Sequence, residues 1–143
     1  MKWGDAPTKE MQFTIRDDFG DKYYLLSSNA GQIGGVHLFA IGYSFFNNRF
    51  CQVEIEFMKS EGKDLLIDLE GQWGKPAVDA GEKWYWHTRN ENPNDTTAIL
   101  DLSRNNDGML TIYQDQVVQP ILDKIDRELQ EKWKKRPIAK GDL

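Results

Sequence analysis

The feature that most constrains this fold is a pair of strand-like runs, VHLFAIGYSFF at 36–46 and RFCQVEIEFM at 49–58, separated by two asparagines. Along the second run, apolar residues alternate with Gln52, Glu54 and Glu56. A period of two is typical of a strand with one buried and one solvated face. We therefore predict an antiparallel hairpin whose second strand buries Cys51, Val53, Ile55 and Phe57.

The length of the hairpin loop decides which faces of the two strands coincide. A loop of two residues would pair Ala40 with Ile55, whereas a loop of three residues pairs Ile41 with Ile55 and Phe39 with Phe57. Because a slip of one residue exchanges every face, the register that joins apolar residue to apolar residue is favoured. We predict the three-residue loop.

The rest of the chain supplies further strands and helices. Short runs rich in β-branched and aromatic residues predict strands at 11–17, 22–26, 83–89, 96–103 and 108–114, the last three as an antiparallel meander. Helices are predicted at 5–10, within 59–76 and within 116–137. In the last helix Pro120 is expected in the first turn, where its missing N–H costs nothing. That helix has an apolar stripe of Val118, Ile121, Leu122, Ile125, Leu129 and Trp133.

The order of these elements predicts an α+β fold, in which the hairpin and the three-stranded meander form an antiparallel sheet with two main helices packed on one face. The 143 residues are enough for one domain with one core, so residues 1–143 are treated as a single domain with a frayed tail at 138–143.

Composition argues against some classes of function. A formal net charge of -5 argues against a nucleic-acid partner, because Lys and Arg contacts to phosphates supply most non-specific affinity. The chain has no apolar run of the length that spans a bilayer, so no transmembrane segment is expected. One cysteine allows no disulfide within the chain. The oligomeric state stays open.

Residues suited to catalysis or metal binding are few. His37 and His87 lie in predicted strands without a carboxylate at ligand spacing, so neither a metal nor a cofactor is expected. Cys51 is expected to be buried and unreactive. No serine lies in the glycine-flanked turn of hydrolases. The sequence favours a protein that is not an enzyme, with no catalytic residue assigned.

The segment KWYWHTR at 83–89 is the strongest candidate for a binding site. As a strand it places Trp84 and Trp86 on one face, where they match the apolar faces of the next two predicted strands. The opposite face carries an outward row of Lys83, Tyr85, His87 and Arg89, called the cationic row below. It is suited to an acidic protein surface or a small anionic ligand. The alternative is a solvated sheet face.

Three segments, KWGDAPTKEM, GYSFFNNRF followed by VEIEF, and LEGQWGKP, together resemble a loose group of small uncharacterised bacterial proteins. In that group a Trp-Gly opening, a Tyr-x-Phe hairpin and a helix ending in Gly-Lys-Pro recur, often behind a secretory or lipoprotein signal. The resemblance implies an export signal upstream of Met1 and a location in the bacterial envelope, either periplasmic or lipid-anchored. It implies no catalytic residue, and a cytoplasmic location is the alternative.

Three functional interpretations follow. The first is an interaction module of the bacterial envelope that acts through its open sheet face. The second is a small-molecule binding protein with a pocket between the aromatic residues of the hairpin and the terminal helix. A hydrolase assembled from residues far apart in the sequence is a distant third.

Overall fold

The computed structural model describes residues 1–25, 32–33, 35–89 and 94–135. Its strands are β1 (Gln12–Asp17), β2 (Gly20–Leu25), β3 (Gln32–Ile33), β4 (Val36–Phe46), β5 (Arg49–Met58), β6 (Val78–Asp79), β7 (Lys83–Thr88), β8 (Thr96–Asp101) and β9 (Asp107–Gln114). Its helices are the short 3-10 helix η1 (Lys59–Glu61), α2 (Gly62–Trp73) and α3 (Asp115–Lys135). The predicted tail at 138–143 lies outside the described residues.

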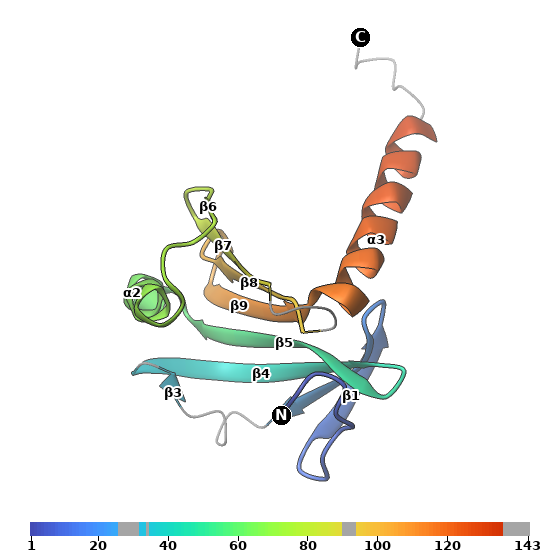
Figure 1. Cartoon of the computed structure of the whole chain (residues 1–143), viewed down its shortest axis with the longest axis horizontal. Coiled ribbons are helices and arrows are strands. Elements are labelled where there is room, and N and C mark those ends of the chain that lie inside the picture. The colour runs from blue at the N-terminus through green and yellow to red at the C-terminus, as the bar shows by residue number, and fades with distance from the viewer. Residues whose placement is uncertain (26–31, 34, 90–93, 136–143) are drawn as a thin grey trace.

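The strands join into one antiparallel sheet in the order β1-β2-β4-β5-β9-β8-β7-β6, and β3 pairs with β4 beside this path (Figure 1). The predicted α+β class with an antiparallel sheet is confirmed. The finer plan of a hairpin plus a three-stranded meander is not matched. The sheet is larger, because β1, β2 and β6 extend it at its two edges.

The hairpin differs from the prediction at its turn. Asn47 and Asn48 both have positive φ, 52° and 62°, and they form a two-residue turn in place of the predicted loop of three. Ile41 nevertheless pairs with Ile55, as predicted. The register is restored by a β-bulge at Cys51, because one extra residue on a strand shifts all later pairs by one position.

A second irregularity in the same ladder changes the partner of Phe57. It pairs with Leu38, so the predicted pairing with Phe39 is wrong. Phe39 falls at the irregularity between Leu38 and Ala40, and its side chain is 43% exposed.

The bulge turns Cys51 away from the face where it was predicted. Val53, Ile55 and Phe57 belong to the larger core on one side of the sheet, whereas Cys51 packs with Tyr113 and Val118 on the other. The Cys51 thiol donates to the Ser44 carbonyl oxygen at 3.5 Å. The residue is buried, as expected, but in a second and smaller cluster.

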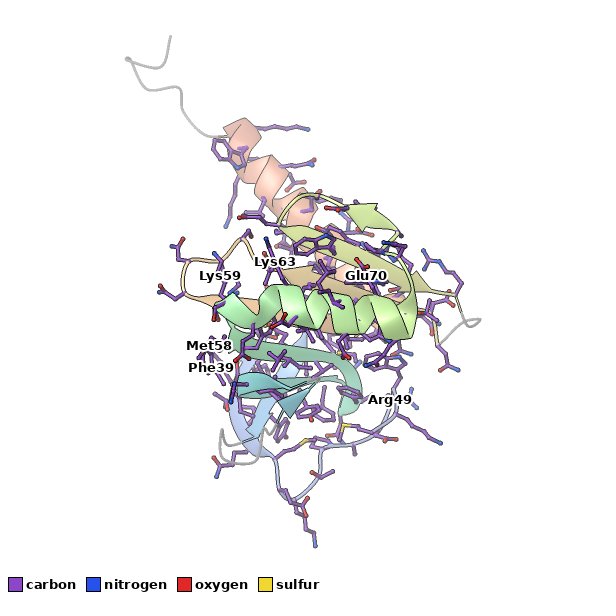
Figure 2. The ribbon with its side chains drawn as sticks, turned by 90° about the vertical axis from the view of Figure 1, so that its left-hand side faces the viewer. Phe39, Arg49, Met58, Lys59, Lys63 and Glu70 are labelled. Carbon is purple, nitrogen blue, oxygen red and sulfur yellow. The ribbon has the colours of Figure 1, made fainter. Side chains whose placement is uncertain are left out.

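The two α-helices pack against opposite faces of the sheet, so their predicted packing on one face is wrong. Leu65 and Leu69 of α2 belong to the core cluster of Leu110, whereas Val118 of α3 packs with Tyr113. Positions 110 and 113 of β9 are three residues apart, and residues an odd number apart on a strand point to opposite faces. Figure 2 shows α2 in front of the strands. In Figure 1, strands β7, β8 and β9 are drawn between α2 on the left and α3 on the right.

The start of the chain and the start of α3 also differ from the prediction. Residues 5–10 are not helical. The backbone of Gly4 and Asp5 binds the hairpin instead. The Gly4 N–H donates to the Phe50 carbonyl oxygen at 2.9 Å, and the Phe50 N–H donates to the Asp5 carbonyl oxygen at 2.7 Å. Because α3 begins at Asp115, Pro120 lies in its second turn and not in the first.

Candidate functional site

In the segment KWYWHTR, the two tryptophans lie in the core, as the sequence predicted. Trp84 and Trp86 are 9% and 5% exposed and belong to the main core, which confirms that assignment. The Trp86 indole N–H also donates to the Gly74 carbonyl oxygen at the end of α2, at 3.0 Å. These rings are therefore not a platform for stacking a ligand.

Lys83, Tyr85 and His87 of the cationic row lie on the other face of β7, and Arg89 follows the last residue of that strand. Lys83 Nζ lies 3.8 Å from the Asp101 carboxylate, and Arg89 Nη1 lies 2.6 Å from the Asp115 carboxylate. Tyr85 is half-buried between the two ends, on a strand position opposite Ile99. The structure thus does not gather the four residues into one site.

The pKa of Asp101 is affected by the charge of Lys83, the first residue of the cationic row. Partial burial acts to raise the pKa, but hydrogen bonds from Ser103 and the charges of Lys83 and Arg104 outweigh burial, so the pKa is lowered. Asp101 therefore stays ionised down to lower pH than an isolated carboxyl. Its charge offsets that of Lys83.

His87 and Arg89 lie at the other end of the row, beside a polar hollow of about 470 Å³ at the start of α3. Thr97, which is 2% exposed, donates its hydroxyl proton to Asp115 Oδ1 at 2.6 Å. Since that proton is used, His87 Nδ1 is the donor in its 2.9 Å contact with the Thr97 hydroxyl. Sequence reasoning missed Asp115 because it assigned this residue to no element.

Tyr113 extends the polar network of the hollow. Its hydroxyl donates to Gln119 Oε1 at 3.1 Å, and Gln119 Nε2 donates to Asp123 Oδ1 at 3.0 Å. Burial raises the pKa of the Tyr113 phenol, so it stays a neutral donor through the physiological range. This arrangement orients polar groups at the base of α3, and the cationic row remains a prediction.

A larger groove, of about 930 Å³, lies between α3 and the hairpin turn. Its apolar lining comes from Trp3, Phe46, Val117, Pro120, Ile121 and Ile125, and its polar lining includes Arg49, Lys124 and Glu128. Trp3 is held there by stacking on Phe50, with ring centroids 4.8 Å apart. The groove occupies the region between hairpin and terminal helix that the ligand-binding interpretation named.

Beyond this groove α3 projects past the sheet (Figure 1). Exposure rises along the apolar stripe: Val118 is fully buried, Ile125 is half-buried, Leu129 is 51% exposed and Trp133 is 67% exposed. A shallow hollow of about 620 Å³ lies over Leu129 and Trp133. Residues 125–133 of this stripe are called the distal stripe below.

Sequence reasoning missed the distal stripe as a surface because it assigned the whole stripe to the sheet. A stripe has the same period whether a sheet or a partner covers it. Only the structure shows where this cover ends, because Val118 is the one buried residue of α3 in the described part of the chain.

Three observations concern metal binding, the reactivity of the cysteine and the membrane. In residues 1–25, 32–33, 35–89 and 94–135, no three His, Cys, Asp or Glu side chains come together as a metal site. Burial raises the pKa of the Cys51 thiol to about 11, which keeps it protonated and a poor nucleophile at neutral pH. No helix within the described residues has the length and apolarity to cross a membrane.

Comparisons with known proteins identify no relative of this chain. No family model matches the chain, and neither a curated protein nor a solved structure matches it.

Proposed function

We propose that this protein is a non-enzymatic interaction module that binds an amphipathic helix of a partner along the distal stripe of α3. The observation that carries the proposal is that the stripe continues past the last residue the sheet buries. Leu129 and Trp133 keep the spacing and direction of Val118 and Leu122, but at 51% and 67% exposure.

The energetics of the exposed stripe favour a partner. Burying an apolar side chain that is otherwise exposed stabilises by roughly 1.5 to 3 kcal/mol. Leu129 is 51% exposed and so retains about half of its surface for such burial. The outward face of α3 is polar and is linked along the helix, for example by Gln130 Nε2 donating to Asp126 Oδ2 at 3.3 Å. One side of the helix is thus suited to water and the other to an apolar surface.

A helix is the partner element that best fits a single projecting helix. An amphipathic helix presents residues at i, i+3, i+4 and i+7, which match the stripe spacing, and it satisfies its own backbone hydrogen bonds. An extended strand would need an open sheet edge, which the distal stripe does not offer.

Selection of peptides from a random library on the immobilised protein tests this proposal. We expect enrichment of amphipathic helical sequences that bind the wild-type chain and the Ile67→Glu variant but not the Leu129→Glu variant. Ile67 is the matched control, because it is a 70% exposed aliphatic residue on α2. Enriched peptides that bind Leu129→Glu as well as wild type would refute the proposal.

A second candidate is a small-molecule binding protein, favoured by the groove between α3 and the hairpin turn. Its volume of about 930 Å³, its apolar lining and its few polar groups match the general character of ligand sites. A fragment screen by NMR tests it. Shifts that cluster at Phe46, Ile121 and Ile125 would support this function, and shifts scattered over the surface would count against it.

We further propose a location in the bacterial envelope. The support is the resemblance of the opening, the hairpin and the Gly-Lys-Pro helix end to small exported proteins. The test is the gene sequence upstream of the codon for Met1. A secretory or lipoprotein signal there supports the envelope, and an in-frame stop codon followed by a start at Met1 would exclude it.

A further inference from the structure

We propose that the helix bound by the distal stripe is α3 of a second copy of this chain, paired antiparallel around Leu129. This inference rests on the proposed function, because it names the occupant of the same surface. It is argued from the positions of charged residues beside the stripe and from where the domain lies on the helix.

The stripe and its flank follow from helical spacing. At 3.6 residues per turn, Ile125 and Leu129 lie on the side of α3 that Val118 directs toward the sheet. Glu128 and Lys132 are one turn apart on the same edge of this stripe. Both side chains are exposed, and both line the shallow hollow over Leu129. One edge of the stripe thus carries an acid followed by a base.

An antiparallel two-fold arrangement makes this edge complementary to itself. With Leu129 near the axis, Ile125 faces the partner's Trp133, and Leu129 faces the partner's Leu129. The same flank of each helix then faces its symmetry mate, so Glu128 lies opposite the partner's Lys132 and Lys132 opposite the partner's Glu128. The two ion pairs arise together from one symmetric interface.

The position of the domain on the helix also favours this arrangement. The sheet holds the first turns of α3 through Val118, and the distal turns project beyond it (Figure 1). Antiparallel pairing places the two sheets at opposite ends of the helix pair, whereas parallel pairing would bring both to the same end. A membrane surface fits less well, since Glu128 beside the stripe would face anionic headgroups.

The interface is small. About three turns of each helix are covered, which is less than the roughly 800 Å² per partner of a standard stable interface. We therefore expect a reversible dimer whose population rises with protein concentration.

Sedimentation equilibrium of the full chain over a range of concentrations tests the inference. The mass is expected to rise from 16.6 kDa toward twice that value. Leu129→Glu is expected to weaken dimerisation by roughly a hundredfold, because it brings two like charges to the apolar centre of the interface. The control Ile67→Glu, on α2, is expected to dimerise as wild type does. Equal dimerisation of Leu129→Glu and wild type would overturn the inference.

Charge exchange tests the register. Glu128→Lys and Lys132→Glu are each expected to weaken the dimer roughly tenfold, since two attractive pairs become repulsive. A mixture of the two variants is expected to form a heterodimer, because every cross pair is again attractive. A mixture that stays as monomeric as its components would overturn the antiparallel register.

The outcomes separate this inference from the proposed function. A wild-type chain that stays monomeric at all concentrations, but still selects peptides that depend on Leu129, refutes self-pairing and leaves the interaction module standing. A chain that is monomeric and selects no such peptide refutes both.

Discussion

Raising the pH from 8 to 11 should destabilise this protein through the Cys51 thiol. The side chain is 1% exposed and burial raises its pKa from 9.0 to about 11. The folded state therefore binds the proton more tightly than the unfolded state. The resulting stability is fully present below pH 9 and is lost as the pH rises through the folded pKa.

The size of this loss follows from the two pKa values. With a pKa of 9.0 unfolded and about 11 folded, the free energy of unfolding should fall by about 1 kcal/mol at pH 10 and about 2 kcal/mol at pH 11. Because the side chain is buried, solvent screening does not reduce this figure.

Urea unfolding of the wild type and of Cys51→Ala, under reducing conditions at each pH, measures the effect. Tyrosine and lysine titrations act on both chains, so the difference between the two free energies isolates the thiol. That difference should shrink as the pH rises above 9. A difference that stays constant from pH 8 to 11 would refute the reasoning and with it the buried position that the β-bulge gives Cys51.

Three further predictions concern the free energy of unfolding, measured by urea denaturation at neutral pH. Val118→Ala should cost about 2 kcal/mol because it leaves a cavity at a fully buried site, whereas Leu129→Ala should cost less than about 0.5 kcal/mol, and equal losses would contradict the exposure of the distal stripe. Gly108→Ala should cost about 1 to 3 kcal/mol because its added carbon would overlap the Phe57 ring, and an unchanged stability would contradict that packing. Arg89→Ala should cost less than about 1 kcal/mol, and less still at high salt, because the Arg89 side chain of this ion pair is 65% exposed; a larger loss would show a structural role.

The local pattern of the sequence predicted the elements well because strand and helix periods are properties of neighbouring residues. The pairing of Ile41 with Ile55 was predictable because it joins apolar faces. The turn and bulge by which the hairpin reaches that register were not predictable from the sequence. A two-residue turn with a bulge and a three-residue loop give the same pairing here, and the alternation of apolar residues does not distinguish them.

The side of the sheet on which each helix packs was not predictable from the pattern. Thr97, Ile99 and Tyr113 lie on the face that α3 partly covers, although the pattern of the sequence predicted a face open to solvent. Their mixed polarity is compatible with either interpretation. The length of the projecting part of α3 likewise depends on tertiary anchoring through Val118, which no local signal encodes.

The short helix predicted at 5–10 failed because capping and proline signals are weak beside tertiary hydrogen bonds. Asp5 accepts from the backbone N–H of Lys2 at 2.8 Å and so does not cap a following helix. The two backbone bonds to Phe50 then hold the segment against the hairpin. A local preference of about 1 kcal/mol is easily overcome by such contacts.

Hydrogen–deuterium exchange along α3, measured at several protein concentrations, tests most directly whether the distal stripe is an interface. The backbone amides of 125–135 should exchange fast in dilute protein and slow down as concentration rises, and Leu129→Glu should abolish this change while Ile67→Glu leaves it intact. Amides of 125–135 that are equally protected at every concentration and in both variants would contradict the account.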